Sequence, residues 1–206
     1  MPALLAPLDE ARENLRVIRQ TMERSTKYST LSGLSGVLIG LTAIVGVLAT
    51  RRLIGLGLEH HQPLKAVQPT LGLVWLLVLA FAVSIEFAWN KRRAARIGKR
   101  VASPLGVHII VAALPSGIAA VVLTAFFYLN NLFASVWGVW MLCYGLAICA
   151  VGLFSVRPVT YLGAAFVLAG GVTLLLPNHL HLFMMALTFG GFHILYGTLM
   201  ARKHGW

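Results

Sequence analysis

Three ionisable side chains interrupt long apolar runs of the sequence: Glu86, His108 and His193. An ionisable group inside a bilayer is costly and is by default a functional candidate. Glu86 lies in AVSIEFAWN, four residues before Asn90 and just ahead of six basic residues. His193 precedes Met200 by seven residues, about 10 Å along a helix. All three fall in the inner third of the bilayer, which favours a polar pocket where Glu86 and a histidine carry protons or cations.

Each of these residues also has a simpler interpretation. Glu86 is close enough to the end of its span to extend its carboxylate to the headgroups, or to pair with Arg93 at helical spacing. His108, four residues past Pro104, is compatible with the headgroup zone. His193 is compatible with a neutral imidazole hydrogen-bonded to a neighbouring helix. The sequence alone leaves both interpretations open.

Pro115 lies in the middle of a predicted span, in AALPSGIAA. Its ring removes one backbone hydrogen bond and frees the carbonyl near Val111, which predicts a kink. Transporters expose backbone carbonyls to a substrate at such breaks, although kinked helices are also common without transport. Cys149 and Tyr196 lie on the same half of the membrane, so Pro115 is a further candidate for the pocket.

A second group of histidines lies in the loops on the opposite side: His60, His61, His179 and His181. Imidazole suits zinc, copper or nickel, and His-x-His chelates if both rings point one way. Such a metal site requires the first and last spans to be neighbours. Haem between His108 and His193 is disfavoured because their depths differ by about a turn. We therefore expect no cofactor, with a metal on the loop histidines as the alternative to solvated side chains.

The sequence contains no recognisable catalytic set. It has no Ser-His-Asp arrangement, no phosphate-binding glycine loop and no HExxH motif, and its single aspartate is Asp9. The sequence therefore favours a protein that is not an enzyme. Nucleic-acid binding is also not expected, because the basic run Lys91–Arg100 is a short loop between spans that suits lipid headgroups.

The elements that position these residues are membrane spans. Of the 206 residues, 58% are hydrophobic and only 11% are charged, a composition that a bilayer solvates and a soluble fold does not hide. The sequence predicts an all-α, integral-membrane six-helix bundle over residues 31–206. The predicted spans are Leu31–Thr50, Leu71–Trp89, Val107–Leu129, Phe133–Phe154, Val159–Pro177 and Leu182–Met200.

The distribution of basic residues predicts the orientation of the bundle. Fourteen of the 17 Lys and Arg residues flank the spans on one side, which leaves Arg51, Arg52 and Lys65 on the other. Cytoplasmic loops carry the excess of Lys and Arg. Both termini are therefore predicted to be cytoplasmic.

Residues 1–30 are predicted to form a separate amphipathic helix. Apolar residues recur there at intervals of three and four: Leu8, Ala11, Leu15, Ile18 and Met22. One apolar stripe on a charged helix is typical of a helix lying on the inner membrane surface or on the bundle. A coiled-coil or partner-docking helix is the alternative.

Small residues recur at helical spacing in at least three spans: Ser32, Gly36 and Gly40; Gly138, Gly145 and Gly152; Ala165, Ala169, Gly170 and Gly171. In lipid, small residues let helix backbones approach closely. The pattern predicts a compact bundle, and one small-residue face could serve a homo-oligomer or a partner membrane protein.

The stretch RQTMERSTKYSTLSGLSGVLIG, Arg19 to Gly40, resembles the start of a group of uncharacterised bacterial multi-span membrane proteins. These share a Met-Glu-x-Ser-x-x-aromatic run that leads into Leu-Ser-Gly-Leu-Ser-Gly. The resemblance implies a bacterial inner membrane and carries no activity and no site residues. We expect a non-catalytic membrane component or partner subunit. The alternative is a small transporter or ion-conducting protein using Glu86, His108 and His193.

Overall fold

The computed structural model describes residues 13, 15–16, 33–96 and 104–204, and these residues form helices without a strand. Residues 1–30 lie almost entirely outside the described part. The expected amphipathic helix there is represented only by Glu13, Leu15 and Arg16, which are helical and exposed, with Arg16 Nη1 3.7 Å from Glu13 Oε2.

Six helical segments are long and apolar enough to cross a membrane, which confirms the predicted all-α six-helix architecture. The sixth segment consists of two α-helices with a π-helix between them. The elements are α2 (Gly33–Glu59), α3 (Leu64–Arg96), α4 (Pro104–Leu129), α5 (Ser135–Gly152), α6 (Arg157–Leu175), α7 (Asn178–Met185), η2 (Ala186–Phe192) and α8 (His193–His204).

Two helices extend beyond the predicted spans. We expected the first span to end at Thr50, but α2 continues through Arg51 and Arg52 to Glu59. Both arginines are exposed, and charged side chains leave the apolar layer without interrupting the backbone hydrogen bonds of a helix. The helix α3 begins at Leu64 instead of Leu71 and contains Pro69 near its start.

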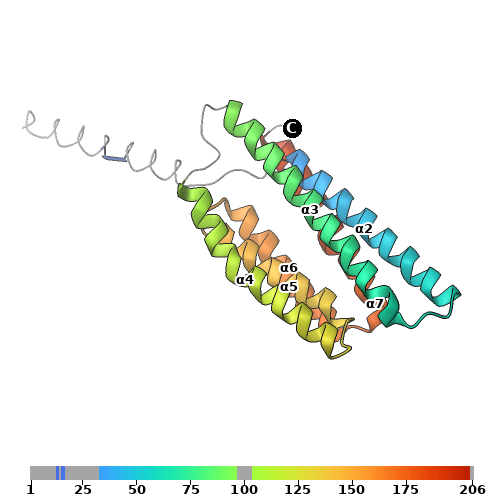
Figure 1. Cartoon of the computed structure of the whole chain (residues 1–206). Coiled ribbons are helices and arrows are strands. Elements are labelled where there is room, and N and C mark those ends of the chain that lie inside the picture. Colours follow the sequence, from blue (N-terminus) through green and yellow to red (C-terminus); the bar gives the residue numbers. More distant parts are fainter. Residues whose placement is uncertain (1–12, 14, 17–32, 97–103, 205–206) are drawn as a thin grey trace, which may run out of the picture.

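The helices form two groups of three (Figure 1). In one group α2 packs on α3 and on the last segment, and in the other α5 packs on α4 and α6. The two groups meet where α5 and α6 approach α7 and η2. Gly33 lies against Ala201, so the first and last described helices begin and end on one side. We call this side, which carries Lys91 and Arg92, the basic end.

Aromatic side chains join the two groups in the half of the bundle away from the basic end. The Trp75 ring of α3 lies 5.7 Å from the ring of Trp137 and 5.9 Å from that of Trp140, both on α5. The indole N–H of Trp75 donates to Thr50 Oγ1 at 3.0 Å, and that of Trp140 to Thr124 Oγ1 at 2.8 Å. Each threonine belongs to a neighbouring helix, so these bonds hold helix pairs together.

Glycines lie at the closest helix crossings. A Cβ added at Gly36 would be 3.0 Å from Gly197 Cα, and one added at Gly145 would be 2.8 Å from the Gly163 carbonyl oxygen. These pairs let α2 approach α8 and let α5 approach α6. By contrast, no described residue of α4 is fully buried, and α4 packs chiefly on α5.

We predict that Gly145→Ala destabilises the bundle and that Gly117→Ala does not. The added methyl group at residue 145 would also lie 2.6 Å from the Val167 backbone nitrogen, whereas nothing lies within 4 Å at residue 117. Forcing α5 from α6 costs about 1–3 kcal/mol. The melting temperature in mild detergent measures this, and equal melting temperatures for the two variants would show that the crossing is not tight.

Candidate functional site

The candidate site lies where the last membrane segment changes from a π-helix to an α-helix. His193, the first residue of α8, donates its backbone N–H to the Gly190 carbonyl. The carbonyl oxygen of Phe189, four residues earlier in the chain, instead forms a hydrogen bond with the His193 ring nitrogen Nδ1 at 3.0 Å. A π-helical turn changes the backbone pairing by one residue, and such turns are frequent at functional sites.

The hydrogen bonds of His193 determine which ring nitrogen carries the proton. A carbonyl oxygen only accepts, so Nδ1 is the donor to Phe189 and Nε2 of the neutral ring is an acceptor. The Tyr144 hydroxyl of α5 lies 2.7 Å from Nε2 and therefore donates to it. The side chain of His193 is 3% exposed, and both of its ring nitrogens have partners inside the protein.

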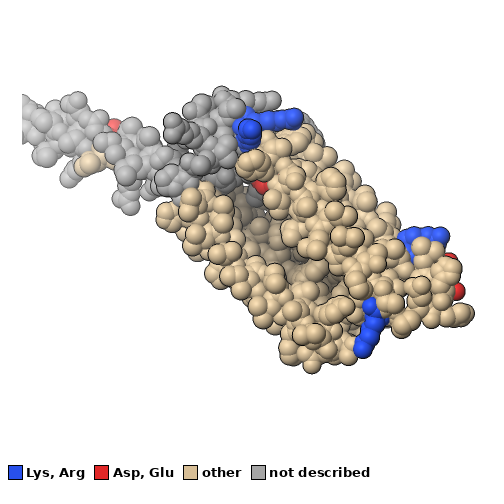
Figure 2. All heavy atoms as spheres, viewed as in Figure 1, with Lys and Arg blue, Asp and Glu red and all other residues tan. Residues whose placement is uncertain are grey.

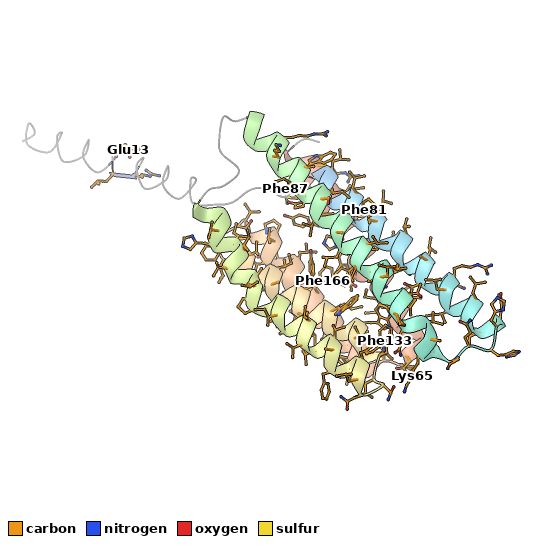
Figure 3. The ribbon with its side chains drawn as sticks, in the orientation of Figure 1. Glu13, Lys65, Phe81, Phe87, Phe133 and Phe166 are labelled. Atoms are coloured by element: carbon orange, nitrogen blue, oxygen red, sulfur yellow. The ribbon has the colours of Figure 1, made fainter. Side chains whose placement is uncertain are left out.

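Aromatic rings surround this hydrogen bond. Phe166 of α6 is fully buried, and its ring centroid lies 4.8 Å from that of Tyr144 and 5.4 Å from that of His193. The Phe189 ring stacks on the imidazole at 6.3 Å. Figure 3 shows Phe166 in the interior of the bundle, whereas Phe81 and Phe87 of α3 are exposed. Aromatic rings thus enclose the site on the side of α6.

Glu86 of α3 is a further ionisable residue in this half of the bundle. It precedes Lys91 of the basic end by five residues. The side chain is half-buried and its Oε2 atom is enclosed. Among the described residues, Glu86 is the one acidic side chain inside a span and away from a helix end. We call Glu86, Tyr144, His193 and Tyr196 the polar cluster.

The structure joins His193 of α8 to Tyr144 of α5, and Glu86 lies on α3 in the same half of the bundle. His108 is exposed on α4, with its ring centroid 6.5 Å from that of Phe154, so it is not part of the buried cluster. Pro115 is exposed, and α4 continues through it. The backbone irregularity beside the site is η2, not the proline.

The loop histidines occupy different environments. His60 and His61 form an exposed turn after α2, and His179 is exposed at the start of α7. His181 is buried, and its Nδ1 and Nε2 atoms lie 2.9 Å from the carbonyl oxygens of Ala134 and Leu176. No three His, Cys, Asp or Glu side chains of the described chain gather as a metal site. His181 instead connects α7 to the start of α5 and the end of α6.

Sequence reasoning missed Tyr144, although it named Tyr196 as lying at the same level as Glu86 and His193. A tyrosine in an apolar run is ordinarily a packing residue. One signal was present: each of these tyrosines directly precedes a glycine, Gly145 or Gly197, and both glycines lie at helix crossings. A residue next to such a crossing is close to the neighbouring backbone and is well placed to meet a polar group there.

Comparison of the chain with protein-family models, curated proteins and solved structures finds no match. The fold and the apolar helices define a multi-pass helical membrane protein. Its activity has to be inferred from the polar cluster itself.

We predict that Tyr144→Phe lowers the stability of the bundle while Tyr161→Phe, at an exposed position of α6, does not. The first variant leaves the buried Nε2 of His193 without its donor, at a cost of about 1–2 kcal/mol. Thermal unfolding in detergent measures the difference. Indistinguishable melting temperatures would mean that the Tyr144–His193 bond contributes nothing net.

Proposed function

We propose that the protein is a small transporter or ion-conducting membrane protein, with the polar cluster as its site. One observation carries the proposal: His193 of α8, which is 3% exposed, shares a hydrogen bond of 2.7 Å with the Tyr144 hydroxyl of α5 inside the bundle. Intramembrane carboxylates and histidines that face the interior mark ion and proton pathways. Because the site contains residues of α3, α5 and α8, any movement between the two helix groups also changes its geometry.

The hydrogen-bond geometry supports a role in moving protons. When neutral, His193 accepts the Tyr144 proton at Nε2. A proton that arrives on Nε2 makes both ring nitrogens donors, and the Tyr144 oxygen must then accept. The hydroxyl proton of Tyr144 turns away from the imidazole and becomes available to another acceptor. Tyr144 thereby connects the protonation of His193 to the surroundings of Glu86.

The π-helix provides a means of coupling this site to a helix movement. Gly190 of η2 lies against Gly40 of α2, where an added Cβ would be 2.6 Å from the Gly190 oxygen. Conversion of a π-turn to an α-turn shifts the residues that follow the turn by one position relative to the neighbouring helices. We propose that such a shift would carry His193 past Tyr144 and would break and remake their bond.

A second candidate function, a non-catalytic partner subunit, is favoured by the exposure of α4. Large apolar side chains such as Ile110, Val121 and Leu129 are exposed on this helix, which packs chiefly on α5. Lipid covers such a face equally well, so the polar cluster carries the stronger argument. The partner-subunit proposal requires Glu86 to be dispensable for any ion movement.

We also propose that the basic end lies in the cytoplasm of a bacterial inner membrane, as the distribution of Lys and Arg supports. Single cysteines replacing Lys91 and His60, in a chain without Cys143 and Cys149, test this. In intact spheroplasts a membrane-impermeant maleimide is expected to label the cysteine at residue 60 and to reach residue 91 only after permeabilisation. The reverse pattern would invert the orientation.

We predict protein-dependent proton movement that Glu86→Gln abolishes. Purified protein is reconstituted in liposomes that contain a pH-sensitive dye, and a potassium diffusion potential drives protons inward. Wild-type protein is expected to acidify the interior faster than protein-free liposomes do. Because glutamine keeps the size but not the charge of the side chain, Glu86→Gln is expected to reduce the rate to the protein-free level.

The matched control is Glu59→Gln, an acidic residue exposed at the end of α2, which is expected to keep the wild-type rate. Protein-dependent proton movement that survives in folded Glu86→Gln would remove Glu86 from the pathway. No movement above protein-free liposomes in the wild type would reject the transport proposal and leave the partner-subunit function.

A further inference from the structure

His181 of α7 is buried at the end of the bundle opposite to the basic end, where three helices meet. Its side chain is 3% exposed. Its Nδ1 atom lies 2.9 Å from the carbonyl oxygen of Ala134, the residue before α5. Its Nε2 atom lies 2.9 Å from the carbonyl oxygen of Leu176, the residue after α6. One imidazole ring therefore links the start of α5 and the end of α6 to α7.

The two partners of the His181 ring are of one chemical kind. A carbonyl oxygen only accepts hydrogen bonds, and a neutral imidazole has one N–H donor and one acceptor nitrogen. A neutral His181 therefore satisfies one carbonyl and directs a nitrogen lone pair at the other from 2.9 Å. Only the protonated ring, in which both nitrogens carry a proton, donates to both carbonyls at once. The geometry around His181 is thus that of an imidazolium.

His193 provides a contrast within the same membrane segment. Its Nδ1 atom faces a carbonyl oxygen, that of Phe189, but its Nε2 atom faces the Tyr144 hydroxyl. A hydroxyl either donates or accepts, so the neutral form of His193 is fully satisfied, whereas the neutral form of His181 is not. Both histidines are buried to the same extent. The difference between them comes from their partners.

The position of the Leu176 carbonyl also favours a positive charge. The last carbonyl groups of a helix have no partner within it and carry a partial negative charge. Leu176 follows α6 directly, and its carbonyl oxygen lies against the His181 ring. Hydrogen bonds from a charged donor are about twice as strong as those from a neutral one. Both effects stabilise the protonated ring.

The charged side chains at this end of the bundle lie on its surface (Figure 2). The end of α2 lies beside α7, because Gly33 is against Ala201 and Gly40 is against Gly190, so that α2 runs antiparallel to the last segment. The charged and titratable residues of this region are all exposed: Arg51, Arg52, Glu59, His60, His61, Lys65 and His179. Arg52 and Glu59 form an ion pair at 3.8 Å. Water and salt screen exposed charges, so repulsion from the arginines is weak beside two direct hydrogen bonds.

The other elements that pack against α7 bring no ionisable side chain to His181. These elements are α5, α6 and η2, and η2 contains no titratable residue. On α5 the nearest such residue is Cys143, about 14 Å along the helix from Ala134. On α6, Arg157 and Tyr161 lie near the opposite end of the helix. The two carbonyl oxygens are therefore the groups that determine the protonation of the ring.

We propose that His181 is a pH-sensitive link between three helices at the end opposite to the basic end. In acid, the ring carries two protons and ties the ends of α5 and α6 to α7. When one proton leaves to water, one carbonyl oxygen loses its donor and faces a nitrogen lone pair, so that helix end separates from the ring. This role does not depend on proton movement at the polar cluster.

The direct test is the protonation of the His181 ring in the wild-type chain. Leu180–His181 is the only Leu-His pair in the sequence. Leucine labelled at its carbonyl carbon, combined with uniformly labelled histidine, therefore identifies His181 by NMR in detergent micelles without a substitution. Both ring nitrogens are expected to carry protons at about pH 5, and only one at about pH 8. A ring that is neutral at about pH 5 in the folded protein, or that keeps both protons at about pH 8, would overturn the proposal.

The melting temperature in detergent measures the effect on the bundle. Glutamine does not titrate, so His181→Gln removes the contribution of this ring to the pH dependence. Between about pH 8 and pH 5, the wild type is expected to gain about 2–4 °C relative to His181→Gln. The matched control is His179→Gln, at an exposed position two residues away, which is expected to keep the wild-type pH dependence. Identical pH dependence in the wild type and His181→Gln would contradict the link, and the wild-type NMR titration decides alone if that variant does not fold.

Discussion

Polar groups inside the apolar helices need partners from the protein, because lipid offers them none. This constraint accounts for the side-chain hydrogen bonds between helices. The Trp75 and Trp140 indoles donate to threonines of neighbouring helices, and His193 has a partner on each ring nitrogen. In water each of these bonds would be replaceable by a solvent bond. In a membrane its loss leaves a polar atom in hydrocarbon, so these few bonds stabilise the helix pairs that they join.

The number and class of the helices follow from apolar length, which is why the sequence predicted them. Their ends did not follow, because Arg51 and Arg52 mark where the apolar layer ends and not where the helix ends. The histidines show a second limit. His179 and His181 are two residues apart, yet one is exposed and the other is buried between two carbonyls. Their difference depends on where α5 and α6 end, which only the packed bundle specifies.

The polar cluster was predictable in part, and for a definite reason. Glu86 and His193 are conspicuous because ionisable groups are rare inside spans. Tyr144 is not conspicuous, since its ring packs as an apolar side chain while its hydroxyl bonds to His193. The π-helix was hidden because periodicity cannot reveal one extra residue in a turn. Gly190 and Gly191 indicate close packing, and only the hydrogen bonds distinguish a π-turn from an α-turn there.

The helices of the bundle are not all packed equally tightly. Glycine crossings fix α2 to α8 and α5 to α6, whereas α4 has no fully buried residue among those described and α3 opens toward the basic end. The polar cluster lies on this boundary. Tyr144 and His193 belong to the tightly packed helices, and Glu86 belongs to the looser α3. Movement of α3 relative to α5 and α8 therefore changes the surroundings of the Glu86 side chain without separating Tyr144 from His193. That dependence is the property that a binding site needs in order to couple occupancy to a change of conformation.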